Sequence, residues 1–247
     1  MTRLHEMERG FRLGEPSDWV VPIVPAAVIF DLGRAGPFEN HPDASFGYRA
    51  CRRARTSFAV GSVGAGTGAR AGGLQGGVGT ASRRTPNGHV VSALAVVNAI
   101  GSVIDAETGL PWHLGRWVVS EPSARRRRQL AEILTNRPGA SPHLNTTIGV
   151  VATDAPLDKA WCTKLADVAH DGLARAIRPA HSMNDGDCIF ALSTNHSDVA
   201  VDVSSFNAIL SAAADVFAEA CTGAILEAVD LGGSPAYRQF LPSSGRG

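Results

Sequence analysis

The residues best suited to chemistry are Asn145-Thr146-Thr147, between a polar, proline-containing segment (137–143) and an apolar one. A hydroxyl residue that follows a flexible segment can attack the preceding carbonyl in an N-to-O acyl shift. If the 145–146 bond breaks, Thr146 gains an α-amine with a pKa of about 7.7–8.0, suitable as a base at neutral pH. The Thr146 hydroxyl is then the nucleophile. The other interpretation is structural, because threonine is common where strands begin.

Two further groups could support such a site. Asp185-Gly186-Asp187 precedes an apolar run, and its carboxylates could bind a hard cation or orient the amine of a nucleophile. The same three residues also suit a tight turn. Asn98 follows an apolar strand-like run, so its amide could donate to an oxyanion or simply cap a turn.

Other motifs fit known chemistry poorly. Residues 61–79 contain nine glycines but no Lys, which excludes a P-loop, and the glycines continue past the point where a dinucleotide-binding helix should begin. A structural loop that lines a pocket with backbone N–H groups fits better. His181 and Ser182 offer a base and a hydroxyl without the elbow of a serine hydrolase. The four arginines at 125–128 predict a solvated helix face.

Composition narrows the function further. The 247 residues carry 23 basic and 23 acidic side chains, so no net charge favours nucleic acid or an anionic membrane. The four cysteines form no CxxC pair, and the charged N-terminus has no apolar signal-peptide core. We therefore expect a cytoplasmic protein without nucleic-acid or membrane partners.

Hydrophobic periodicity predicts strands mixed with long helices, an α/β or α+β arrangement. The helices are expected over 4–9, 125–134, 157–177 with Asp158 as cap, and 205–229, and a helical or mixed stretch is expected over 46–59. The strands are expected in the second half of 20–31 and over 89–97, 101–105, 146–153 and 188–193.

Six segments in this order resemble a known family: PIVPAAVIFDLG from 22, GSVGAGTGA from 61, GGVGTAS from 76, ALAVVNAIGSVID from 93, NTTIGVVATDA from 145 and MNDGDCIFAL from 183. From about Gly10 to Val229 the chain is similar to the self-processing N-terminal-nucleophile hydrolases of the L-aminopeptidase/D-esterase type. That group includes β-peptidyl aminopeptidases and nylon-oligomer hydrolases.

The resemblance implies a layered α/β/β/α sandwich, cut between Asn145 and Thr146 into an α chain (1–145) and a β chain (146–247). Thr146 would be the nucleophile, Asn98 the oxyanion-stabilising residue, and Asp185 with Asp187 the acidic pair of its hydrogen-bond network. No metal or organic cofactor is implied. The substrate would be a short peptide or amide with a free N-terminus, and processed units would form a homo-oligomer.

The chain departs from the family pattern in three places. A lysine usual in the glycine-rich stretch is replaced by Gly73 or Gln75, with Arg70 nearby, and a tyrosine of some relatives is Phe30 here. The α-chain part is short at its N-terminus. Two alternatives to an aminopeptidase therefore remain: an acyltransferase of the ornithine acetyltransferase kind, or a catalytically inactive, truncated relative.

Overall fold

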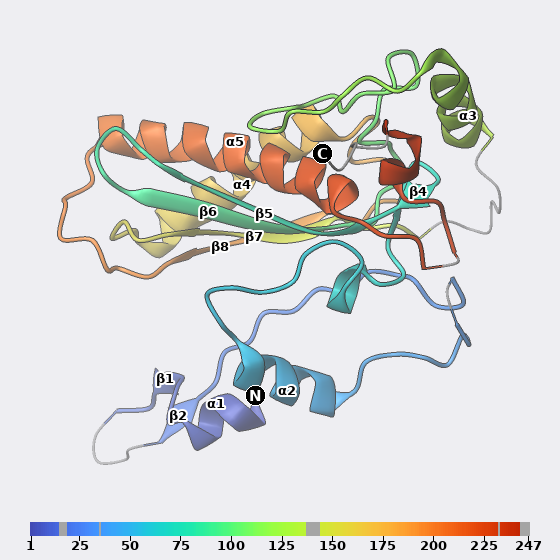
Figure 1. Ribbon diagram of the computed structural model, residues 1–247. Coiled ribbons are helices and arrows are strands. Elements are labelled where there is room, and N and C mark those ends of the chain that lie inside the picture. Colours follow the sequence, from blue (N-terminus) through green and yellow to red (C-terminus); the bar gives the residue numbers. More distant parts are fainter. Residues whose placement is uncertain (15–18, 35, 137–143, 232, 243–247) are drawn as a thin grey trace.

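A four-stranded sheet with a layer of helices on one face forms the centre of the protein in this computed structural model (Figure 1). The structure describes residues 1–14, 19–34, 36–136, 144–231 and 233–242, so the polar segment expected over 137–143 lies outside the described residues. The elements are α1 Thr2–Glu6, β1 Phe11–Arg12, β2 Val20–Val21, α2 Ala44–Arg53, η1 Gly64–Gly66, β3 Arg70–Ala71, β4 Leu74–Gln75, β5 Gly77–Arg84, β6 Val90–Val97, α3 Ala124–Thr135, β7 Ile148–Thr153, α4 Lys159–Ala176, β8 Cys188–Ser193, α5 Val203–Leu226 and η2 Tyr237–Phe240.

The sheet has the strand order β5-β6-β7-β8. β5 and β6 form an antiparallel hairpin, β6 also pairs antiparallel with β7, and β7 pairs in parallel with β8. The parallel step requires a crossover, which α4 supplies, with Asp158 capping its first turn by accepting a hydrogen bond from the Trp161 N–H. As a result, the end of β6 and the starts of β7 and β8 meet at one edge of the sheet.

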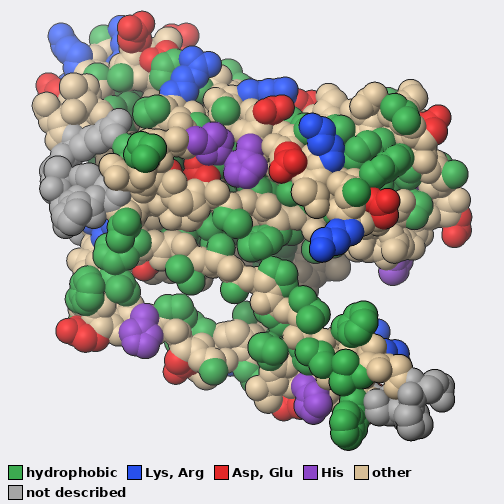
Figure 2. All heavy atoms as spheres, turned by 180° about the vertical axis from the view of Figure 1, so that it is seen from behind, with side chains coloured by type: hydrophobic (Ala, Val, Ile, Leu, Met, Phe, Trp, Pro, Cys, Tyr) green, Lys and Arg blue, Asp and Glu red, His purple; other side chains and the backbone are tan. Residues whose placement is uncertain are grey.

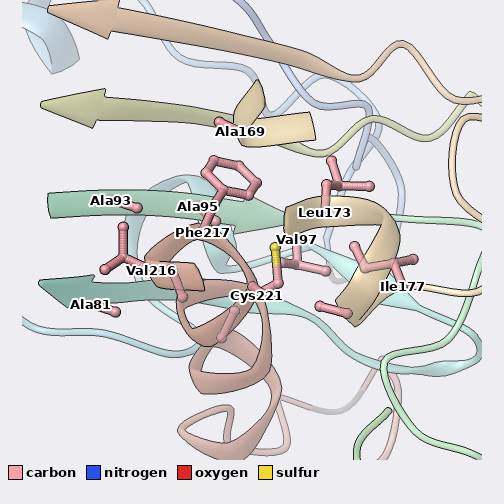
Figure 3. Close-up of a cluster of buried hydrophobic side chains, with 14 of the residues drawn as sticks. Ala81, Ala93, Ala95, Val97, Ala169, Leu173, Ile177, Val216, Phe217 and Cys221 are labelled. Carbon is pink, nitrogen blue, oxygen red and sulfur yellow. The ribbon is translucent and has the colours of Figure 1, made fainter. Parts of the chain in front are cut away.

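The helices α4 and α5 cover one face of this sheet and enclose the core (Figures 1 and 3). Phe217 of α5 lies over Ala95 of β6 and Leu173 of α4 lies near Val97, and all of these side chains are fully buried. α5 is long and apolar enough to cross a bilayer, but 78% of its most apolar window is buried inside the structure. It is therefore the central helix of a packed core.

Glycines let α5 lie directly on the sheet. A Cβ atom on Gly79 of β5 would be 1.9 Å from the carbonyl oxygen of Ala220, and one on Gly77 would be 2.6 Å from that of Ala224. These distances are far below van der Waals contact, so the close approach requires glycine at both positions. The glycine-rich stretch is thus partly a strand, which the sequence pattern did not predict.

Residues 1–60, here called the N-terminal arm, extend away from the open face of the sheet (Figure 1). The helices α1 and α2 bury none of their side chains, and Figure 2 shows open space between parts of the arm and the body. Val28, in the segment predicted as a buried strand, is 78% exposed and lies in irregular chain. That strand prediction is wrong, because an apolar run becomes a strand only where a neighbouring strand pairs with it.

The remaining element predictions are confirmed to within a few residues, except that the helical or mixed stretch expected over 46–59 is helix only over Ala44–Arg53, and that no strand covers 101–105. There the chain forms isolated bridges, Ser102 with Arg178 and Ile104 with Pro111. The α/β class is also confirmed. Beyond the four-stranded sheet, the strands within the described ranges are two-residue pairs, so these residues form one helix layer and one full sheet layer.

Candidate active site

Three strand ends bring the predicted site residues together. Asn98 directly follows β6, Thr146 lies two residues before β7, and the acidic pair precedes β8. The Thr146 N–H donates a hydrogen bond to the carbonyl oxygen of Asn98 at 2.8 Å, and Asn145 bridges to Asp185 in parallel register. Residues nearly ninety positions apart therefore share one small region at the sheet edge.

The peptide bond between Asn145 and Thr146 is tightly surrounded. The Thr146 hydroxyl donates to the Asn145 carbonyl oxygen at 2.5 Å, and the Gly186 N–H donates to the same oxygen at 2.9 Å. The Asn145 N–H in turn donates to the carbonyl of Asn184 at 3.0 Å. Two donors on one carbonyl oxygen draw electrons from its carbon, which makes that carbon more open to attack.

Gly186 has a steric role as well. A Cβ atom there would lie 3.1 Å from the Thr146 hydroxyl oxygen, closer than most side-chain contacts. The glycine between the two aspartates therefore leaves room for the hydroxyl. Sequence analysis treated it as a turn residue only.

Asn98 is fully buried and its amide is held in one orientation. Its Oδ1 accepts from Arg34 Nη1 at 2.5 Å and from the Arg70 N–H at 3.1 Å, while its Nδ2 donates to the Phe30 carbonyl at 3.2 Å. The Arg70 contact matches the expectation that the glycine-rich stretch presents a backbone N–H. The arrangement leaves Nδ2 as the donor that a reacting oxygen could take over.

Arg34 is the functional candidate that sequence reasoning missed. Besides Asn98, its guanidinium donates from Nη2 to Asn145 Oδ1 at 3.0 Å, so it links the two asparagines. Burial and the nearby positive charge of Arg70 lower the pKa of Arg34. A single arginine in a loop carries no pattern that sequence analysis could have detected.

The acidic pair binds backbone at the same edge. Asp185 accepts from the Ile100 N–H at 3.1 Å and from the Ser182 hydroxyl at 2.6 Å. Asp187 accepts from the Thr147 N–H at 2.8 Å and from His181 Nδ1 at 2.7 Å. Asp185 thus holds the backbone two residues after Asn98, and Asp187 holds the backbone of the residue after Thr146.

His181, first considered as a base beside Ser182, instead contacts Asp187, with its Nδ1 2.7 Å from Asp187 Oδ2. Its ring lies 5.0 Å from that of His170 on α4, centroid to centroid. Burial, followed by the charge of His181, lowers the pKa of His170. His181 therefore contacts Asp187, and His170 contacts His181.

The positions expected to replace the family lysine have other roles. Gly73 has a φ of +96°, and the buried Gln75 amide donates to the carbonyls of Thr67 and Ala69, which fastens the glycine-rich loop. The Arg70 side chain donates to the carbonyls of Arg34 and Gly233. The two lysines of the chain, Lys159 and Lys164, are exposed on α4.

One surface hollow lies away from these residues, and the described ranges hold no metal-ligating cluster. A hollow of about 280 Å³ is bordered by other residues: Trp117, Val118, Val119, Ser120, Leu226, Leu241 and Pro242. Within the same ranges, no three His, Cys, Asp or Glu side chains gather in a way that could hold a metal ion. The reactive groups gathered here are hydroxyl, amide and carboxylate groups.

Comparisons with known proteins agree with the resemblance seen in the sequence. The profile of peptidase family S58 matches residues 3–238. An uncharacterized aminopeptidase of Mycobacterium tuberculosis (strain ATCC 25618 / H37Rv) is 44% identical over 257 residues, which cover 99% of this chain and 74% of the relative. A 6-aminohexanoate-oligomer endohydrolase of Kocuria sp. (strain KY2) is 29% identical over 225 residues, covering 83% of this chain and 61% of the relative.

Among solved structures, the chain is similar to a Burkholderia sp. beta-aminopeptidase, with a TM-score of 0.57 and 27% identity. The likeness covers 79% of this chain but only 56% of the Burkholderia protein. This chain therefore spans little more than half the length of that structure.

Proposed function

Because the chain belongs to peptidase family S58, we propose that it is a self-processing peptidase that cuts its own 145–146 bond and then uses Thr146 as an N-terminal nucleophile. The observation that carries this proposal is the hydrogen bond from the Thr146 hydroxyl to the Asn145 carbonyl oxygen, with the Gly186 N–H on the same oxygen. The attacking group and the activated carbonyl are thus in contact before any reaction.

The proposed self-cleavage has two steps. The Thr146 oxygen attacks the Asn145 carbonyl carbon, its proton passes to the departing nitrogen, and the C–N bond breaks to leave an ester and a free amine. Water then hydrolyses the ester, which restores the hydroxyl and gives Asn145 an α-carboxylate. The Gly186 N–H stabilises the oxyanion of the first step, a type of contact worth about 3–4 kcal/mol in the transition state.

After self-cleavage, Thr146 and Asn98 would act on the carbonyl group of a substrate. The α-amine of Thr146 takes the hydroxyl proton, and the hydroxyl oxygen attacks the substrate carbonyl. The α-ammonium then passes this proton to the substrate nitrogen, so that the amine leaves, an acyl-enzyme forms and the α-amine is a free base again. Asn98 Nδ2 exchanges its bond with the Phe30 carbonyl for one with the developing oxyanion. Water, with the amine as base, releases the acyl group.

The acidic pair keeps the nucleophile in place during both reactions. Asp187 holds the Thr147 N–H next to the nucleophile, and Asp185 holds the Ile100 N–H two residues after Asn98. These carboxylates act through the backbone, so they fix the distance between the hydroxyl and the oxyanion donor.

We propose that the substrates are short peptides or amides with a free N-terminus. The processed αβ units that act on them would assemble into a homo-oligomer. The named activities of the Burkholderia and Kocuria relatives, a beta-aminopeptidase and a 6-aminohexanoate-oligomer endohydrolase, support this class. The acyltransferase alternative differs only in the acceptor of the acyl group. Product analysis with added ornithine separates water from an amine acceptor.

The test is the intact mass of the purified chain after incubation at neutral pH. We expect two species that divide at Asn145–Thr146, no cleavage of Thr146→Ala, and slower cleavage of Thr146→Ser, which keeps a hydroxyl. Thr163→Ala is the matched control, because Thr163 is exposed on α4 and its hydroxyl bonds only to the Lys159 carbonyl among the described contacts. Cleavage of Thr146→Ala at the same bond would show that another group is the nucleophile.

A further inference from the structure

We propose that Arg34, with Arg70 behind it, forms a carboxylate-binding site beside Thr146. This inference rests on the proposed function, because it assigns a ligand to the same site. The ligand chemistry is a carboxylate, which can come from two sources: a peptide substrate or the Asn145 terminus made by self-cleavage.

The guanidinium of Arg34 has donors to spare. Among the described residues it uses Nη1 for Asn98 Oδ1 and Nη2 for Asn145 Oδ1, which accounts for two of its five N–H groups. Both acceptors are neutral amide oxygens. A planar fork of this kind binds a carboxylate more strongly than it binds neutral oxygens, through two charge-assisted hydrogen bonds.

Arg70 adds a second positive charge and fixes the first. Its Nη2 donates to the Arg34 carbonyl at 3.2 Å and to the Gly233 carbonyl at 2.8 Å. In the described part of the chain, neither arginine forms an ion pair with a carboxylate. Two half-buried guanidinium groups therefore lie close enough for the charge of Arg70 to act on Arg34, and neither is paired with a carboxylate among the described residues.

The electrostatics of the pair favour an added anion. Burial has the largest effect in lowering the pKa of Arg34, and the charge of Arg70 adds to it. Asp31, in the same turn, acts in the opposite direction with the smallest of the three effects. A bound carboxylate would offset both destabilising effects at once.

Both sources of the carboxylate lie within reach of this geometry. Self-cleavage would place a new α-carboxylate on Asn145, the residue whose side chain Arg34 already holds. A substrate whose carbonyl replaces that of Asn145 at Thr146 could present its own C-terminal carboxylate to the same guanidinium. The experiment must separate these two.

The first arm compares alanyl-alanine with alanyl-alanine amide as substrates of the processed protein. If the substrate supplies the carboxylate, KM for the acid is about ten-fold below that for the amide, the effect of one charge-assisted pair. Arg34→Gln removes the difference, Arg34→Lys keeps part of it, and the control Arg84→Gln keeps it all, because Arg84 is exposed in the β5–β6 hairpin.

The second arm follows the Asn145 α-carboxyl of the processed protein by carbon NMR. If the chain end supplies the carboxylate, its pKa lies below the usual range of about 3.3–3.7 in the wild type and returns to it in Arg34→Gln. A positive result in either arm supports the site and identifies the source.

A third measurement does not depend on self-cleavage. In Thr146→Ala, we expect acetate, but not acetamide, to shift the side-chain NMR resonance of Arg34. An uncut wild-type chain would remove the proposed function and still leave this test. Equal KM values, a normal Asn145 titration and no response to acetate would together overturn the carboxylate site.

Discussion

At the scale of single residues, the site is built from side chains that hold backbone groups of neighbouring strands. Asp187 is the clearest example, since its side chain is 4% exposed and bridges the Thr147 N–H to His181. A carboxylate accepts at both oxygens, whereas an amide places an N–H₂ group at one of them. Replacement would therefore set a donor against a donor.

We predict that Asp187→Asn lowers the free energy of unfolding by about 1–3 kcal/mol, the usual effect of leaving a buried partner unsatisfied. Denaturant titration in the Thr146→Ala background, where the chain stays uncut, measures this directly. Asp171→Asn, at an exposed position of α4, should change stability little. A stability loss of the same size in both variants would contradict the role given to Asp187.

A second residue-scale prediction concerns pH and His170. Its folded-state pKa lies below the unfolded value, because burial and the charge of His181 oppose protonation, against the weaker opposite effects of Asp187, Asp167 and Asp171. As pH falls below about 6.5, the unfolded chain therefore takes up this proton before the folded one, and stability is lost. The contribution is neutral above that pH.

We therefore expect wild-type stability to fall between about pH 7 and pH 5 more steeply than that of His170→Gln, which cannot take up the proton. Thermal unfolding across this pH range measures the two slopes. Parallel slopes would show that His170 does not contribute to the acid sensitivity.

At the scale of elements, local patterns predicted the second half of the chain well. The strands over 146–153 and 188–193 and the two long helices follow from apolar periodicity, which depends on burial along one element at a time. β5 was not predicted because its glycines are required by the close approach of α5. This is a tertiary contact, which leaves no local pattern in the sequence. The apolar run after Pro25 was wrongly predicted as a buried strand, because its local pattern is apolar but it is exposed and pairs with no strand in the described chain.

The residues of the candidate site also fall into those that the sequence predicted and those that it did not. Thr146, Asn98 and the acidic pair could be named from the sequence because each sits where a strand begins or ends, and the resemblance connected them. The roles of Arg34 and Gly186 depend on contacts across forty or more residues of chain, which no spacing rule contains.

We predict that Gly79→Ala destabilises the protein by about 1–3 kcal/mol or more, because the new methyl group meets the backbone of α5 and the two elements must separate. Gly47→Ala is the matched control: a Cβ there has nothing within 4 Å, and alanine favours the helix by up to about 1 kcal/mol. Equal stability of Gly79→Ala and the wild type would disprove the direct packing of α5 on β5.

At the scale of the whole molecule, the two parts of the chain on either side of the 145–146 bond share one core. β5 and β6 come from the first part, whereas β7, β8 and both covering helices come from the second. The β6–β7 ladder joins them over six residue pairs, and α5 of the second part packs on β5 of the first. Neither part encloses a core without the other.

Cleavage of the 145–146 bond would therefore make the stability of the fold depend on the association of two chains. The intact chain unfolds in a unimolecular equilibrium. The processed protein unfolds with separation of its α chain (1–145) from its β chain (146–247). We predict that the melting temperature of the processed protein rises with protein concentration, while that of the uncut Thr146→Ala protein does not. Dilution would then inactivate the mature protein, although its precursor can refold at any concentration.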